Sequence, residues 1–123
     1  MKRAKLSKTA VEELVRQFAE LAVQQDMALL SGPQAEVNAL YWKIDAIKEE
    51  LKARPGDQRV ALLPLFDHAN KQVRLKAAHA TLAIAPEAAR AQLEAIAVSG
   101  WQPQAGDAGM ALLELDRGVY KPT

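Results

Sequence analysis

Residues 60–85 read VALLPLFDHANKQVRLKAAHATLAIA, and this stretch decides the fold class. Its first part carries four large apolar residues, Leu62, Leu63, Leu65 and Phe66. The segment Asp67-His68-Ala69-Asn70 predicts a tight turn. After it, apolar residues recur at helical spacings, at Val73, Ala77, Ala78 and Leu82. The stretch therefore predicts two short helices joined by a turn, and such a hairpin must bury its apolar face against neighbours.

The composition favours closely packed helices in a single all-α domain, residues 1–123. Half of the 123 residues are hydrophobic, many of them alanine, and only 5% are aromatic. Charged residues make up 25% and the net charge is +1, so no overall field points to nucleic acid, a membrane surface or an acidic substrate. The chain has no cysteine, which excludes disulfides, thiolate metal sites and cysteine catalysis.

The apolar runs are too short for a membrane span, and Met1–Leu6 has a basic start without the apolar run of a secretory signal. We expect a soluble cytoplasmic protein that does not bind a membrane.

Two long helices are predicted at the N-terminus. Thr9-Ala10-Val11-Glu12 fits a capping box, in which the hydroxyl and the carboxylate bind backbone amides at the start of a helix. Ser31-Gly32-Pro33 ends this helix, with Gly32 expected in the left-handed conformation. A second helix then runs from Pro33 to about Ala53. Together they predict a long antiparallel hairpin over residues 7–54.

The second helix carries apolar residues on two opposite sides. Its main stripe consists of Val37, Leu40, Tyr41, Ile44, Ile47 and Leu51. At about 100° per residue, a second and shallower apolar face consists of Ala35, Ala39, Trp42 and Ala46. Either the later helices of the same chain cover this second face, or a partner protein or second copy does. Tryptophan is enriched among interface residues that carry binding energy, so this face is the first candidate interaction surface.

Arg54-Pro55-Gly56-Asp57 breaks the chain, and further helices are predicted at about 58–67 and 70–84. Pro86 begins another helix, Ser99-Gly100 ends it, and a last helix covers about 106–116. Met110 and Leu113, with Leu112 as a further candidate, are expected on its apolar face. The loop between these two helices carries Trp101. This indole either closes one end of the core or belongs to a second candidate interaction surface.

The segment LLPLFDHANKQVRLKAAHATL, residues 62–82, resembles the HEAT and armadillo helical repeats. The resemblance implies that Ala77 and Ala78 allow close backbone approach. It also implies that Arg74 reaches the turn or the preceding repeat, with Asp67 as the candidate acceptor. The repeat residues are therefore Asp67, Val73, Arg74, Ala77, Ala78 and Leu82. The helices at 86–98 and 106–116 would form a second, degenerate repeat without a Val-Arg pair, so that HEAT-like hairpins cover residues 57–118.

With the long hairpin before it, VRLKAAHATLAIAPEAARAQLEAIA (residues 73–97) is also similar to a small bacterial family of HEAT-like domains of unknown function. That resemblance implies a fold and no active-site residues.

The residue types that can catalyse reactions or bind metals do not occur at the spacings that these functions need. His68 and His79 do not form a zinc-binding pattern, and we expect His79 to be partly buried with a hydrogen-bond partner. The pairs Glu12-Glu13 and Glu49-Glu50 point about 100° apart on a helix, so we expect solvated faces and not carboxylate dyads. No Gly-x-Ser-x-Gly motif and no glycine-rich phosphate loop is present. We therefore expect no enzyme activity, no metal and no cofactor.

Lys2, Arg3, Lys5 and Lys8 form a basic start, and further basic residues lie around the central hairpin. Asp and Glu residues in the chain neutralise much of this charge, which argues against nucleic-acid binding. The sequence thus predicts an all-α fold of about six helices: a long N-terminal hairpin followed by two HEAT-like hairpins. The predicted function is a non-catalytic protein-protein interaction module or small adaptor, through a protein partner or self-association. The alternatives are a toxin-neutralising, immunity-type partner protein and a nucleic-acid-binding helical repeat.

Overall fold

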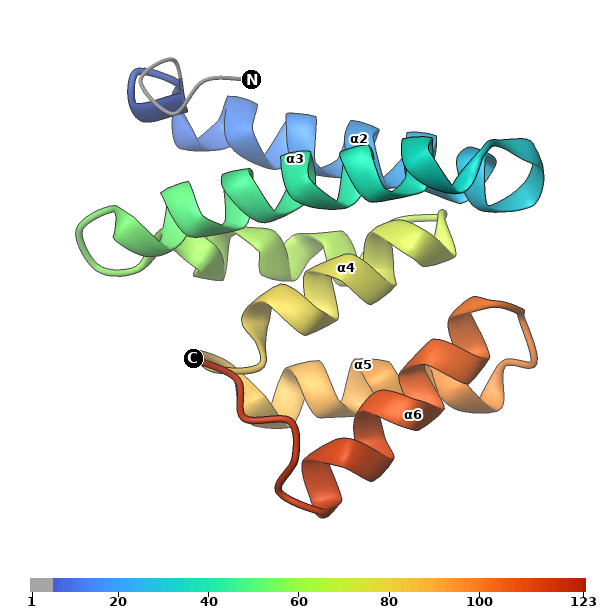
Figure 1. Ribbon diagram of the computed structural model, residues 1–123. Helices are drawn as coiled ribbons and strands as arrows, with labels where there is room; N and C mark the ends of the chain where they lie inside the picture. The colour runs from blue at the N-terminus through green and yellow to red at the C-terminus, as the bar shows by residue number, and fades with distance from the viewer. Residues whose placement is uncertain (1–5) are drawn as a thin grey trace. The chain divides into compact units, whose positions relative to one another are not determined.

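The computed structural model describes residues 6–123, in which every regular element is a helix and no strand occurs. Lys2, Arg3 and Lys5 of the predicted basic start lie outside the described residues. Six helices follow in order (Figure 1): α2 (Val11–Ser31), α3 (Gln34–Ala53), the 3-10 helix η1 (Gln58–Asp67), α4 (Lys71–Thr81), α5 (Pro86–Val98) and α6 (Gln104–Asp116). The predicted all-α class and the long N-terminal hairpin are confirmed. The chain divides into an N-terminal unit that ends at Ala61 and a C-terminal unit, Leu62–Thr123.

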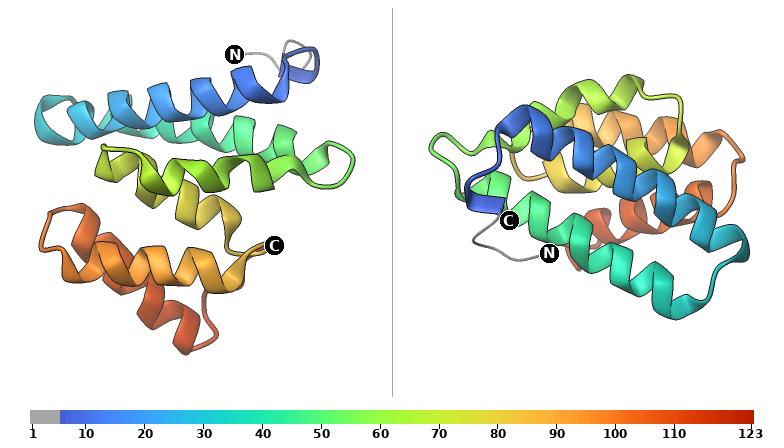
Figure 2. Two further views of the ribbon diagram at one scale, coloured as in Figure 1. Left: turned by 180° about the vertical axis from the view of Figure 1, so that it is seen from behind. Right: turned by 90° about the horizontal axis from the view of Figure 1, so that it is seen from above.

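In the N-terminal unit, α2 and α3 lie side by side and antiparallel (Figures 1 and 2). The buried residues of α3, Leu40, Ile44, Ile47 and Leu51, belong to the predicted main stripe, and α2 buries Leu14, Phe18, Ala19 and Ala22. Gly32 joins the helices with a φ of −91°, so the predicted left-handed conformation is wrong. Glycine is needed there for space, because a Cβ atom on Gly32 would lie 3.0 Å from the Cα atom of Ala28.

The start of α2 differs from the predicted capping box. The N-cap residue is Ala10, one position after Thr9, and its side chain makes no capping hydrogen bond. Arg54, just past the end of α3, holds this segment: its guanidinium donates to the carbonyl oxygens of Leu6 (3.0 Å) and Thr9 (2.7 Å). The same guanidinium donates from Nε to the Glu50 carboxylate at 2.6 Å. Glu50 is 9% exposed, so the predicted solvated face is wrong for this residue.

The predicted turn at 54–57 is present, with positive φ at Gly56 (78°) and Asp57 (52°). Asp57 accepts from Nε of Arg59 at 2.9 Å and from its terminal nitrogen at 2.7 Å. This hydrogen-bonded guanidinium lowers the pKa of Asp57. The pair neutralises Arg59, which is only 4% exposed.

The next element has the predicted bounds but is a 3-10 helix, η1, which contains Pro64. Proline has no N–H to donate into an α-helical ladder, so a run of tighter turns is the compatible alternative.

In the C-terminal unit, α4 and α6 pack against α5. The core consists of Leu75, Ala78, Leu82, Ala89, Leu93, Ile96, Ala108 and Ala111, with Phe66, Ala97, Leu112, Leu115 and Tyr120 packed against it. Four of the eight central side chains are alanine, so the helix backbones approach closely. Met110 and Leu113 are exposed, so the predicted inner face of the last helix is wrong for these two residues. The third candidate, Leu112, packs against the core beside Ala108 and Ala111.

The turn before α4 ends in an N-cap. The Asn70 side-chain oxygen accepts from the backbone N–H groups of Gln72 (2.9 Å) and Val73 (3.1 Å), so it satisfies two of the unpaired amides at the start of α4.

Truncation of one core side chain tests this packing. Leu93 is fully buried among the three helices, so Leu93→Ala should destabilise the protein by about 2–5 kcal/mol, measured by urea unfolding followed by circular dichroism. The matched control is Val98→Ala on the same helix, where the side chain is 85% exposed and the expected change is within about 0.5 kcal/mol. Equal losses in the two variants would contradict the assignment of the core.

Candidate functional site

The second apolar face of α3 is open to solvent at its centre. Ala35 and Ala39 are exposed, Ala46 is half-buried, and Trp42 is 67% exposed. The four residues, called the α3 surface from here on, lie opposite the buried stripe of the helix because of the 3.6-residue period. The structure thus shows an uncovered indole at the position that the sequence analysis selected.

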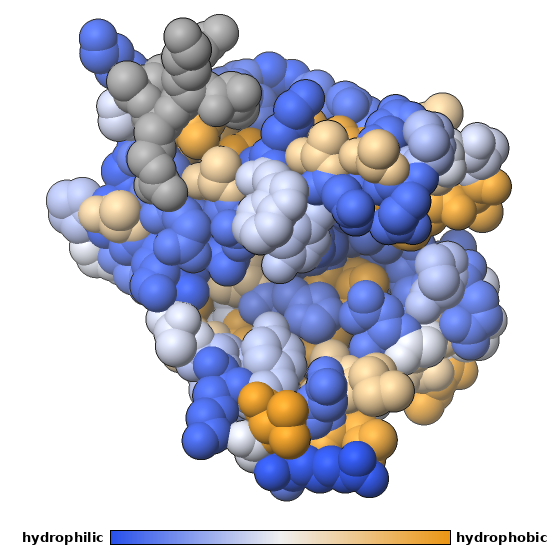
Figure 3. Space-filling view, viewed as in Figure 1, coloured by the Kyte–Doolittle hydropathy of each residue, from blue (hydrophilic) through white to orange (hydrophobic). Residues whose placement is uncertain are grey.

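A neighbouring aromatic side chain extends the α3 surface. The rings of Tyr41 and Trp42 meet edge to face, with centroids 5.0 Å apart. Tyr41 was predicted in the buried stripe but is 44% exposed, because it lies at the edge of that stripe and away from its centre. In the space-filling view of Figure 3, side chains of apolar and intermediate hydropathy lie between hydrophilic ones along α3.

Trp101 lies in the loop between α5 and α6 and belongs to the C-terminal unit. Its side chain is 46% exposed and is not part of the core cluster, so it does not fill the interior of this unit. Lys71 Nζ lies 3.7 Å from the centroid of the Trp101 ring, and the guanidinium carbon of Arg74 lies 5.6 Å from it. Both distances are within the range of a cation–π interaction.

The sequence analysis missed this cluster of Lys71, Arg74 and Trp101. The two cations are three residues apart at the start of α4, which places them on one face, but Trp101 is 27 residues beyond Arg74. Only the packing of α4 against α5 and α6 brings the loop to them. The spacing of the two cations was the sole signal available in the sequence.

The predicted contact between Asp67 and Arg74 is wrong. These two residues form no ion pair within the part of the chain that the structure describes, Asp67 is exposed, and Nε of Arg74 is buried without a hydrogen-bond partner. The guanidinium lies beside Trp101 instead. The other repeat residues, Val73, Ala77, Ala78 and Leu82, are buried as predicted.

His79 links α4 to α6 and to the C-terminal tail. Its Nε2 lies 3.0 Å from Oδ1 of Asp107, and its Nδ1 lies 3.2 Å from the hydroxyl of Tyr120. An ionised carboxylate only accepts hydrogen bonds, so Nε2 of His79 donates to Asp107. The prediction of a partly buried histidine with a partner is confirmed.

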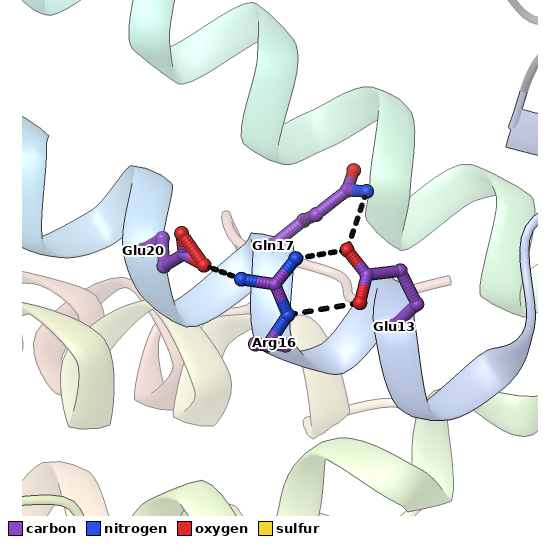
Figure 4. A network of polar contacts seen from close by, with 4 residues as sticks. All are labelled: Glu13, Arg16, Gln17 and Glu20. Atoms are coloured by element: carbon purple, nitrogen blue, oxygen red, sulfur yellow. Dashed lines mark hydrogen bonds and ion pairs between the residues drawn. The ribbon is translucent and has the colours of Figure 1, made fainter.

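The outer face of α2 carries a network of polar side chains (Figure 4). Arg16 binds Glu13 and Glu20, and Gln17 donates to Glu13 at 3.1 Å. Arg16 and Glu20 are more than half exposed, so water and salt screen the pairing. The network is a solvated helix face, as expected for Glu13.

Residues 6–123 hold neither a cluster of metal ligands nor a membrane-spanning helix. These residues contain no group of three or more metal-ligating side chains. No helix among them is both long and apolar enough to cross a bilayer.

The pair of His79 and Asp107 predicts a pH-dependent stability. The hydrogen bond from His79 lowers the pKa of Asp107, so its ionised form stabilises the fold above the ordinary carboxyl pKa and this contribution is lost as the pH falls through the lowered pKa. Because the Asp107 side chain is 55% exposed, Asp107→Asn should cost less than about 1 kcal/mol at neutral pH. In urea unfolding at a series of pH values, the difference from the parent should shrink in acid. An equal difference at acid and neutral pH would place the effect in packing and not in the charge.

Comparisons with known proteins assign the chain to a family. The crystal structure of the protein RPA1889 from Rhodopseudomonas palustris CGA009 superposes with a TM-score of 0.93 and 53% sequence identity, over 96% of this chain and 98% of that one. No curated protein matches the chain significantly. The model of the family described as Domain of unknown function (DUF2019) matches residues 12–116. Because this match covers most of the chain, the chain belongs to the DUF2019 family.

Proposed function

We propose that this chain is a non-catalytic protein-interaction module and that the α3 surface is its binding face. The observation that carries the proposal is the 67% exposure of Trp42 on a helix whose other side is buried. Transfer of a large apolar side chain from water into an interface lowers the free energy, and most of the Trp42 side chain is exposed to water.

The neighbours of Trp42 favour a protein partner. Ala35 and Ala39 are small, so a partner's side chains can reach the backbone of α3 beside the indole. Charged residues such as Glu36 and Lys43 lie at the margins and can form the polar rim that protein interfaces have. Interface tryptophans of this kind carry a large share of the binding free energy.

The proposal of a non-catalytic protein rests on the structural contacts that the titratable side chains make. His79 and Asp107 bind each other and, through Tyr120, hold the tail, so these contacts join structural elements. Arg54 with Glu50 and Arg59 with Asp57 likewise hold chain termini and turns in place.

We also propose that α4 belongs to a HEAT-like hairpin. Full burial of Ala77 and Ala78 supports this interpretation, because repeats of this kind pack through small residues. The exposed outer helix surfaces of such repeats serve as binding surfaces, which agrees with an adaptor role.

The first test is capture of the partner from a lysate of the native cells with the tagged chain, followed by mass spectrometry. Trp42→Ala should weaken capture by about 30-fold, equivalent to a loss of about 2 kcal/mol, because it removes the central anchor. Helicity should not change, since the side chain is mostly exposed. Val98→Ala, which truncates an 85% exposed side chain on α5, is the matched control and should capture as the parent does.

Two outcomes of this test decide between partners. If Trp42→Ala captures the same protein as strongly as the parent, the α3 surface is not the interface. If the purified chain self-associates in sedimentation velocity and Trp42→Ala abolishes that association, the partner is a second copy of this chain.

The helical-repeat interpretation has its own test. Ala77 is fully buried, so Ala77→Leu should overpack α4 and cost about 1–3 kcal/mol in thermal unfolding. The matched control is Ala91→Leu on the exposed side of α5, for which little change is expected. An unchanged melting curve for Ala77→Leu would count against close packing at this position.

A further inference from the structure

Lys71 and Arg74 are two cations without an acidic partner. Arg16, Arg54 and Arg90 each pair with at least one carboxylate. By contrast, neither Lys71 nor Arg74 forms an ion pair with any residue between 6 and 123. The positive charge of this cluster is therefore not neutralised within the described chain.

The position of the two cations makes this charge unfavourable. Residues at i and i+3 share one face of a helix, so Lys71 and Arg74 repel each other. Lys71 is the first residue of α4 and Arg74 the fourth, so both lie near the positive end of the helix dipole, which disfavours further positive charge. The local electrostatics would improve if an anion bound between them.

The side chain of Arg74 is half-buried and makes no hydrogen bond with the described chain. Its Nε is buried and has no hydrogen-bond partner, although a buried donor without a partner costs free energy. Guanidinium groups bind carboxylates through two parallel hydrogen bonds, often with Nε as one donor. A carboxylate beside Lys71 and the exposed part of Arg74 would neutralise both cations.

The surroundings favour a carboxylate on a polypeptide. Trp101 leaves 46% of its surface exposed beside the cations, so an apolar side chain next to the acidic residue could pack on the indole. The amides at the start of α4 are already occupied by Asn70, so they do not offer a phosphate the ring of backbone donors that it usually receives.

We propose that Lys71, Arg74 and Trp101 form a binding site for the side-chain carboxylate of an Asp or Glu residue in an acidic segment of the partner protein. This inference rests on the proposed interaction function, since it supplies the chemistry of that partner. The Trp101 site belongs to the C-terminal unit and the α3 surface to the N-terminal unit, so each can be tested without the other.

The test uses the fluorescence of Trp101 in the full chain. Trp42→Phe removes the other tryptophan, so all indole emission then comes from Trp101. The probe is an acetylated and amidated tetraglutamate peptide, with tetraglutamine as its uncharged counterpart. The site predicts a saturable change in emission with tetraglutamate that weakens as salt is added, and no change with tetraglutamine.

Charge variants assign the binding to the two cations. Lys71→Gln and Arg74→Gln should each weaken tetraglutamate binding by about tenfold, because each removes a charged hydrogen-bond donor. Lys121→Gln removes the same charge from the C-terminal tail and should bind as the parent does. Lys71 is at the first position of α4, so its variant should retain the fold, checked by circular dichroism, even if Arg74→Gln does not.

Three results would overturn the proposal: equal responses to the two peptides, unchanged binding by a folded Lys71→Gln variant, or inorganic phosphate that binds as tightly as tetraglutamate. The outcome is separable from that of the α3 surface. Peptide binding together with undiminished capture by Trp42→Ala would support the carboxylate site and reject the α3 surface. No peptide binding together with weakened capture by Trp42→Ala would reject the carboxylate site and support the α3 surface.

Discussion

Close approach of helix backbones through alanine and glycine is the constraint on which this structure depends. In the C-terminal unit, Ala78, Ala89, Ala108 and Ala111 form half of the central core, and in the N-terminal unit Gly32 leaves room for Ala28. Small side chains bring helices together and leave little space for large rings between them. Aromatic residues are 5% of the chain, and neither tryptophan lies in a core. Both are on the surface, where they are available for binding.

Much of the fold could be predicted because helix periodicity and the proline and glycine positions are local signals. The bounds of α3, η1 and α5 follow directly from them. One of the errors concerns which face of α6 a neighbouring helix covers. Met110 and Leu113 are more hydrophobic than Ala108 and Ala111, yet the alanines are buried because α6 approaches α5 closely. Hydrophobicity alone favours burial of the larger side chains, whereas the short distance between α5 and α6 leaves room only for the smaller ones.

The sequence was sufficient to predict one of the two candidate surfaces, the α3 surface, but not the Trp101 cluster. Trp42 was accessible to prediction because its position opposite a buried stripe is a property of one helix. The Trp101 cluster was not, because its members come from α4 and from the loop after α5. Arg74 shows the same limit: an acidic residue seven positions away was the obvious partner, but tertiary packing gives the guanidinium an indole instead. Contacts between residues on different elements can be identified only when the packing of those elements is known.

The central claim is that the α3 surface contacts another protein chain, and photo-crosslinking in the native cells tests it most directly. With p-benzoylphenylalanine in place of Trp42, irradiation should yield a covalent adduct between this chain and a second polypeptide. The same photoreactive residue in place of Val98, which is also exposed, should yield little of that adduct. Absence of any intermolecular adduct from position 42, or equal yields from both positions, would contradict the account.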